Sequence, residues 1–220
     1  MYHILSHIYM LPLLICTALS LKAWRPSWPV PYKWFSALLI LVLLSESFAI
    51  FWKYYFFYVS KAYSNHNMWF YNIAMIPEHL LYMAFYLQVI RSPVVKRWII
   101  AAAVFYFVFA IVNMFYQSIH DVQFRTILLG YAIIILLTIA YFDQVRKEKE
   151  IIKLSTHPLV WISLGALIFH AGDVPYMLSL NYLNHNNPLA IALSSIHLIL
   201  NSVMYTLYII AFLCHPPPRK

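Results

Sequence analysis

Charged side chains are scarce in this chain. They make up only 10% of its 220 residues, whereas hydrophobic side chains make up 63%. A soluble domain carries about 25% charged residues, so there is too little polar surface here to cover a water-soluble globule. The chain has only 3 glycines and no glycine-rich loop of the kind that binds nucleotide phosphates. Its two cysteines, Cys16 and Cys214, provide neither a disulfide framework nor a cysteine-based metal motif.

The chain instead contains seven long apolar segments. They run over residues 4–21, 34–52, 68–90, 98–117, 124–142, 159–181 and 189–213. A helix needs about 20 residues to cross the hydrocarbon core of a bilayer, whereas a transmembrane barrel needs alternating strands of about ten. The sequence therefore predicts a single all-α domain over residues 1–220, a polytopic membrane bundle of seven transmembrane helices. Pro158 and Pro188 are expected to begin the last two helices, where proline is tolerated.

Basic residues collect in the loops after the first, third and fifth segments and in the C-terminal tail. These are Lys22, Arg25, Lys33, Arg91, Lys96, Arg97, Arg146, Lys147, Lys149, Lys153, Arg219 and Lys220. Only Lys53, Lys61 and Arg125 fall on the other side. The positive-inside rule therefore predicts an N-terminus outside and a C-terminus in the cytoplasm. The same rule accounts for the net charge of +8 without a nucleic-acid partner. Residues 143–157 are expected to extend the fifth helix into the cytoplasm.

Ionisable side chains interrupt four of the apolar segments. They are Glu46, Glu78, His79, His170, Asp173 and His197. A charged group at the centre of a bilayer is unfavourable by about 2.5–3.5 kcal/mol on insertion scales, so these groups are expected to face the bundle interior. With a rise of about 1.5 Å per residue, they lie roughly 9–16 Å below the outer surface. We expect an outward-opening polar cavity. Its predicted lining is Glu46, Asn72, Glu78, His79, His170, Asp173, His197, Asn201 and Tyr205.

Helical spacing refines this expectation. His170 and Asp173 are three residues apart and share a helix face, as do His197 and Asn201, which are four apart. Lysine and arginine are absent from the predicted layer. At least one of its glutamates is therefore expected to be neutral and hydrogen-bonded, because burial disfavours the charged form. An alternative is that neutral carboxyls and histidines only hold the helices together.

Cofactor binding leaves several alternatives open. Carboxylates and imidazoles are ligands for zinc or iron, so a divalent metal is possible, with His170, Asp173 and His197 as candidate ligands. A haem held by His79 and His170 is a second option. No pair of histidines three or four residues apart occurs within a segment. Retinal in its usual attachment is excluded, because segment 189–213 has no lysine.

A succession of short motifs supports a family resemblance. It comprises Glu46, Trp69-x-Tyr71-Asn72 before Pro77-Glu78, Pro158-Leu159-Val160-Trp161-Ile162-x-x-Gly165-x-Leu167-Ile168, and Asn201-x-x-x-Tyr205. This succession resembles a family of short, uncharacterised bacterial seven-span proteins that are often encoded beside sensor histidine kinases. The resemblance implies a multi-pass protein of the bacterial inner (cytoplasmic) membrane with a signalling role. A sensor kinase or another membrane protein is then the expected partner. The chain departs from the family at His170 and Asp173, where an aromatic and an uncharged residue are expected.

A shorter segment, Ala166-Leu167-Ile168-Phe169-His170-Ala171-Gly172-Asp173, is similar to the Gly-Asp segment of lysoplasmalogenase-type membrane hydrolases. Three functions therefore remain: a sensor or receptor-like signalling protein with a polar cavity, a membrane-embedded lipid hydrolase with or without a metal, or a structural bundle without a ligand.

Overall fold

The computed structural model describes residues 7–59, 67–147, 156–179 and 188–214. These residues form α2 (Met10–Ser20), the short 3-10 helix η1 (Leu21–Trp24), α3 (Val30–Val59), α5 (Met68–Val89), α6 (Pro93–Tyr116), α7 (Phe124–Lys147), α8 (Pro158–Ser179) and α9 (Pro188–Leu213). The predicted all-α class is confirmed. The helices correspond one to one with the seven apolar segments of the sequence.

Proline marks several of the helix boundaries. Pro93 is the first residue of α6, and the preceding Ser92 accepts a hydrogen bond from the Val95 amide at 3.4 Å. Pro158 and Pro188 begin α8 and α9 in the same way, because a first-turn residue needs no amide donor for the helix. Pro77 lies inside α5 and Pro175 inside α8, and each helix continues through its proline.

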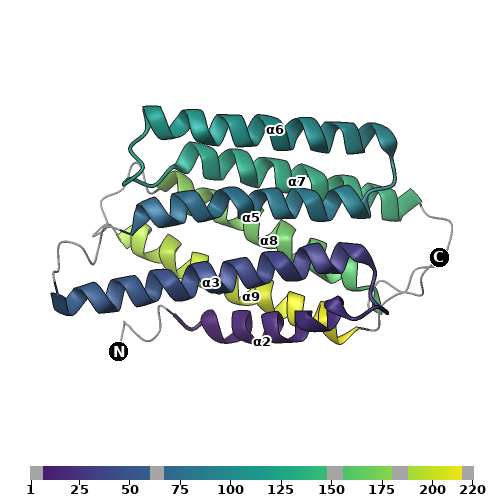
Figure 1. Ribbon diagram of the computed structural model, residues 1–220, viewed down its shortest axis with the longest axis horizontal. Helices are drawn as coiled ribbons and strands as arrows, with labels where there is room; N and C mark the ends of the chain where they lie inside the picture. Colours follow the sequence, from purple (N-terminus) through teal and green to yellow (C-terminus); the bar gives the residue numbers. More distant parts are fainter. Residues whose placement is uncertain (1–6, 60–66, 148–155, 180–187, 215–220) are drawn as a thin grey trace.

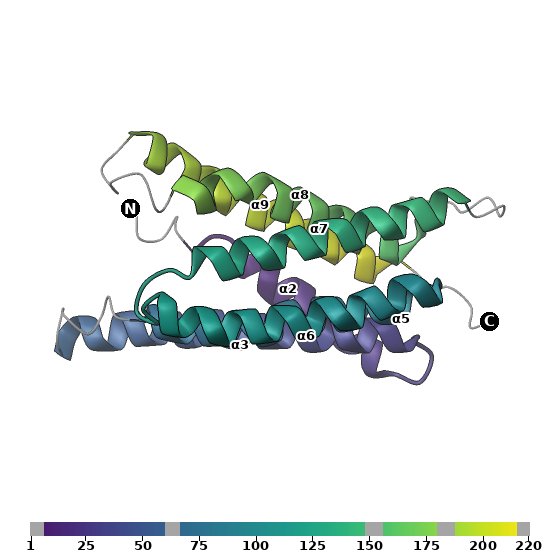
Figure 2. The same cartoon turned by 90° about the horizontal axis from the view of Figure 1, so that it is seen from above.

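Successive helices run in opposite directions along the long axis (Figure 1). Seen from above, α3, α5 and α6 form one layer, and α7, α8 and α9 form a second (Figure 2). At one edge α2 contacts both α3 and α9, and at the other α6 contacts both α5 and α7. The bundle is therefore a closed ring of helices with an interior between its two layers.

Five of the helices, α3, α6, α7, α8 and α9, are long and apolar enough to cross a membrane. On α6, large apolar side chains such as Phe105, Phe107 and Phe115 are exposed, as expected for a surface that faces lipid. The protein is therefore a multi-pass membrane protein in contact with the bilayer. The helix α2 is shorter, and α5, with Pro77, Glu78 and His79 near its middle, is not among the five. The count of seven spans and the orientation of the termini stay predictions.

Three helices extend well beyond the apolar segments predicted for them, among them α6, which begins at Pro93 instead of residue 98. The helix α3 covers Val30–Val59, whereas the sequence predicted 34–52. The helix α7 continues past residue 142 to Lys147, where Asp143 accepts hydrogen bonds from Arg146 at 2.7 Å and Lys147 at 2.5 Å. The extension was predicted to reach residue 157; residues 148–155 lie outside the described residues, and 156 and 157 directly precede α8. Basic residues Lys61, Lys149, Lys153, Arg219 and Lys220 lie outside them as well.

An aromatic cluster fills the interior near the ends of α5 and α9. The Phe35 ring on α3 packs edge-on against Tyr208, at 4.8 Å between centroids, and in a tilted arrangement against Phe85, at 5.1 Å. Phe212 continues this cluster towards Trp28, with 5.9 Å between centroids. Among the described residues, these rings occupy the interior at this end of the bundle. The half of the bundle where α5 and α7 begin contains a cavity instead.

Candidate functional site

A cavity of about 410 Å³ lies between the two layers. Side chains from α3, α5, α7, α8 and α9 line it, together with Tyr9, which directly precedes α2. Met68, the first residue of α5, and Val122, just before α7, are part of the lining. The cavity therefore reaches the end of the bundle where α5 and α7 begin. At its inner limit, the hydroxyls of Tyr82 and Tyr208 are 2.8 Å apart.

Eight of the nine residues predicted from the sequence lie along this one cavity. They are Glu46, Asn72, Glu78, His79, His170, His197, Asn201 and Tyr205. The ninth, Asp173, is fully buried behind the lining, at 0% exposure. Glu78 and His79 both reach the cavity although adjacent helical residues point about 100° apart. The cavity is wide enough for each to line a different part of it.

Tyrosine hydroxyls position Glu46. Its Oε2 accepts hydrogen bonds from Tyr9 at 2.7 Å and from Tyr71 at 3.3 Å. Glu78 on the neighbouring helix interacts with the Ser45 hydroxyl. The two glutamates therefore lie on neighbouring helices of one layer, and hydroxyl groups contact both. No lysine or arginine is among the cavity-lining residues that the structure describes.

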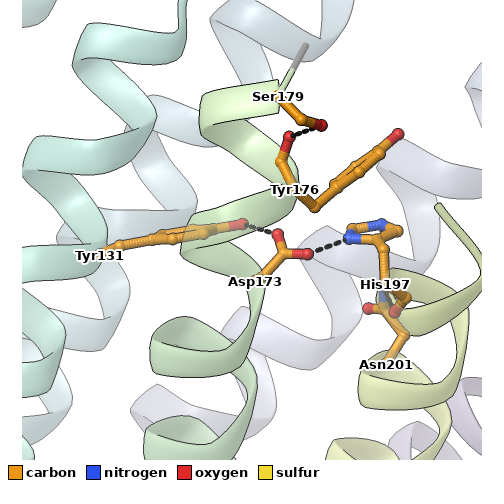
Figure 3. A network of polar contacts seen from close by, with 6 residues as sticks. All are labelled: Tyr131, Asp173, Tyr176, Ser179, His197 and Asn201. Carbon is orange, nitrogen blue, oxygen red and sulfur yellow. Dashed lines mark hydrogen bonds and ion pairs between the residues drawn. The ribbon is translucent and has the colours of Figure 1, made fainter. Parts of the chain in front are cut away.

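Asp173 joins three helices through one carboxylate (Figure 3). Its Oδ1 is 2.6 Å from Nδ1 of His197 on α9, and its Oδ2 accepts a hydrogen bond from the Tyr131 hydroxyl on α7 at 2.9 Å. Asn201, one turn after His197, places its Nδ2 3.0 Å from Nε2 of that ring. The Tyr176 ring lies against the imidazole at 4.7 Å between centroids. Both nitrogens of His197 therefore have partners.

Backbone carbonyls fix the other two histidines. Nδ1 of His79 is 2.8 Å from the carbonyl oxygen of Met75, and Nδ1 of His170 is 2.7 Å from that of Ala166. A carbonyl only accepts hydrogen bonds, so in each neutral ring Nδ1 carries the proton and Nε2 is an acceptor. Within the described part of the chain, Nε2 of His79 has no hydrogen-bond partner. The cavity wall thus contains imidazole acceptors next to two carboxyls.

Asn72 serves the fold as well as the cavity wall. Its Nδ2 donates to the carbonyl oxygens of Ile119 at 2.6 Å and Asp121 at 2.8 Å, and its Oδ1 accepts from the Gln123 amide at 3.3 Å. These bonds tie α5 to the loop between α6 and α7. The structural contribution of Asn72 is therefore clear from its contacts.

The sequence did not reveal the tyrosines that complete the site. Tyr9 and Tyr71 hold Glu46, and Tyr131 holds Asp173. The chain contains 18 tyrosines, and tyrosine is common at membrane interfaces. The presence of a tyrosine therefore does not by itself predict a place in the site. Position Tyr71 did occur in the motif Trp69-x-Tyr71-Asn72, but no role followed from it.

The geometry does not single out a metal centre. No group of three or more histidine, cysteine or acidic side chains is placed to hold a metal ion within residues 7–59, 67–147, 156–179 and 188–214. Of the predicted ligands, His170 directs Nδ1 to the backbone, while Asp173 and His197 bind each other. Divalent metal binding stays a prediction.

Comparisons with models of protein families, with curated proteins and with solved structures find no match for this chain.

Replacing Glu46 tests the contacts that hold it. Glu46→Ala should lower the free energy of unfolding in detergent by about 1–3 kcal/mol, because it leaves the hydroxyls of Tyr9 and Tyr71 without their acceptor. Glu46→Gln should lose less, because the amide oxygen still accepts. Thermal melting of both variants is the measurement. Equal damage from glutamine and alanine would show that the negative charge of Glu46, and not its acceptor oxygen, matters to the fold.

Proposed function

We propose that this protein is a receptor-like sensor of the bacterial inner membrane, which binds a small molecule in a cavity that opens to the outer face. The observation that carries the proposal is the cavity of about 410 Å³, lined by acids and histidines from separate helices. Protein interiors are close-packed and contain few voids larger than a water molecule. A purely structural bundle would fill this volume, so a bound molecule is the better reason for it.

Charge supports the outward direction of the opening. The described basic residues at the ends of η1 and α7 and between α5 and α6 lie at the closed end of the bundle, given the antiparallel order in Figure 1. They include Arg25, Arg91 and Arg146. The positive-inside rule places that end in the cytoplasm. The cavity reaches the other end, through Met68 and Val122, and so faces the outside.

Signalling to a sensor kinase or another membrane protein is the role that the family resemblance implies. The cavity contributes to that role because it touches five helices. A ligand that contacts α3, α5, α7, α8 and α9 together can change their relative positions, provided it binds one arrangement better than another.

A lipid hydrolase is the second candidate, and the Asp173–His197 pair favours it. A carboxylate that holds Nδ1 of a histidine leaves Nε2 to act as a general base. Here Asn201 lies 3.0 Å from Nε2 and occupies that position. Among the described lining residues there is also no serine, threonine or cysteine to act as a nucleophile. Ligand binding therefore accounts for more of the site than hydrolysis does.

Labelling of single cysteines tests the cavity and its direction together. The background carries Cys16→Ala and Cys214→Ser, and Met75→Cys places a thiol in the cavity wall on α5. A small, membrane-impermeant thiol reagent added to intact cells should modify Met75→Cys, because water reaches the cavity from outside. The matched control is Met83→Cys on the same helix, which is buried at 1% exposure and does not line the cavity.

Two further outcomes of this labelling are decisive. Asp143→Cys, exposed at the end of α7, should react only after the inner membrane is permeabilised. Protection of Met75→Cys in both intact and permeabilised cells would contradict an open cavity. Labelling of Asp143→Cys in intact cells would instead invert the proposed orientation.

A further inference from the structure

We infer that the cavity recognises an organic ammonium cation, a molecule with a protonated amino group attached to an apolar body. This inference rests on the proposed receptor-like function, and names the class of ligand that the same cavity takes. Three independent features of the lining support it: the sign of its charge, the surplus of acceptors over donors, and its aromatic walls.

The charge of the lining opposes that of the chain as a whole. The protein carries a net charge of +8, yet the titratable carboxyls that line the cavity are Glu46 and Glu78, with no lysine or arginine among its described residues. The third acid, Asp173, is already paired with His197 and Tyr131. Carboxyls removed from bulk water need a partner of opposite charge or a proton. A cationic ligand provides that partner where the protein does not.

The hydrogen-bonding groups of the wall point to a ligand that donates. Several donors near the cavity are already engaged: Tyr9 and Tyr71 with Glu46, Tyr131 with Asp173, and the Asn72 amide with two backbone carbonyls. Acceptors remain. His79 is buried and lines the cavity, and its Nε2 has no partner within the described residues.

The tautomer of His170 adds to this surplus of acceptors. Its Nδ1–H bonds the carbonyl oxygen of Ala166, so Nε2 of its neutral ring accepts, as does that of His79. An ammonium group carries up to three donors and no acceptor. It therefore matches two carboxyls and two imidazole acceptors better than an anion or a neutral acceptor would.

Aromatic rings form much of the remaining wall. Tyr71, Tyr131, Phe169, Tyr176, Tyr205 and Tyr208 all line the cavity. Ring faces attract cations, with the larger effects where both partners are removed from water. The same rings and the neighbouring methionines provide apolar surface for the body of the ligand. An inorganic ion would use the acceptors alone, and no described group of three or more histidine, cysteine or acidic side chains converges on one point.

Binding of 2-phenylethylamine to the full-length protein in lipid nanodiscs tests this inference. Its neutral counterpart 2-phenylethanol has nearly the same shape and lacks the positive charge. Isothermal titration, corrected with empty nanodiscs, should give an affinity for the amine about tenfold or more above that for the alcohol. This factor corresponds to the net contribution of a charged hydrogen bond. The double variant Glu46→Gln/Glu78→Gln should lose about tenfold or more in amine affinity.

Matched variants keep the test decisive. Asp143→Asn removes an exposed carboxylate at the far end of α7 and should leave amine affinity unchanged. If the double variant does not fold, as judged by thermal melting, Glu78→Gln alone should still weaken amine binding. Equal affinity for amine and alcohol would overturn the inference, as would the absence of binding by either. So would one equivalent of a bound metal that the glutamine variants lose.

Failure of this inference differs from failure of the proposed function. The thiol at position 75 could react from outside while the protein shows no preference for the amine. That result would support the receptor-like function, but with another class of ligand. Protection of the thiol at position 75 in intact and permeabilised cells would contradict both the proposed function and this inference.

Discussion

Asp173→Ala is expected to be the most destabilising single substitution of a polar residue at the site. Asp173 is fully buried and accepts hydrogen bonds from Tyr131 and from His197. Each buried donor left without its acceptor typically lowers the free energy of unfolding by about 1–3 kcal/mol; two donors lose theirs here, and we expect about 3 kcal/mol in total. The total stays below the maximum for two donors because the His197 side chain is 25% exposed, so its freed Nδ1–H can meet water in the cavity.

Chemical or thermal unfolding of the purified protein in detergent measures this effect. Asp173→Asn should fall between the wild type and alanine, because its amide oxygen can still accept one of the two hydrogen bonds. The control is Asp143→Ala, which removes the exposed contacts to Arg146 and Lys147 and should change stability by about 0–1 kcal/mol. If Asp173→Ala is no more harmful than this control, the network in Figure 3 does not hold the helices together.

Gly130→Ala is expected to have the second largest effect. A Cβ atom at this position on α7 would overlap the His79 ring at Cδ2 and lie 2.5 Å from Nε2. The ring is buried and its Nδ1 is bound to the Met75 carbonyl, so it cannot move aside without breaking that bond. Overpacking of this kind typically destabilises by about 1–3 kcal/mol.

Gly172→Ala on α8 is the matched control for this substitution. The atoms nearest to a Cβ there would be the ends of the Leu200 side chain, at 2.9 and 3.0 Å, and that side chain can change rotamer. The melting temperature should therefore fall clearly for Gly130→Ala and little for Gly172→Ala. A similar fall for both variants would mean that the fit of His79 against α7 is not what Gly130 provides.

Long apolar segments and proline made the helices predictable. Each segment of about twenty apolar residues became a helix, and Pro93, Pro158 and Pro188 stand at their starts. The depth of each ionisable side chain in the membrane could also be predicted, because the rise per residue of a helix converts sequence position into distance. That is why Glu46, Glu78 and His197, from three different helices, could be assigned to one layer before their surroundings were known.

The contacts within the layer were not predictable in the same way. Sequence spacing places His170 and Asp173 on one face of α8 but says nothing of which residue on another helix they meet. The pairing of Asp173 with His197 and Tyr131 depends on the rotation of α7, α8 and α9 about their own axes, and this rotation is set by packing across the bundle. The clearance at Gly130 for the His79 ring depends on the same packing.

The lengths of some helices could not be predicted from the sequence either. The predicted segment of α3 ends at residue 52, directly before the charged Lys53. The backbone continues in helical form to Val59, because aromatic side chains such as Trp52 and Phe56, whose rings pack 4.6 Å apart, continue along its surface. The helix α2 ends at Ser20 and is followed by the 3-10 helix η1 over Leu21–Trp24. Within the described residues, α2 is therefore shorter than the full span that the sequence predicted.

An electron cryo-microscopy structure of the full chain in a lipid nanodisc tests the central claim most directly, namely that acids and histidines from separate helices line one cavity inside the membrane. We predict that Glu46, Glu78, His79 and His170 border a single cavity within the bilayer, with the Asp173 carboxylate in contact with His197. Density that places Glu46 or Glu78 against lipid, or that puts their carboxyls in separate, unconnected pockets, would contradict it.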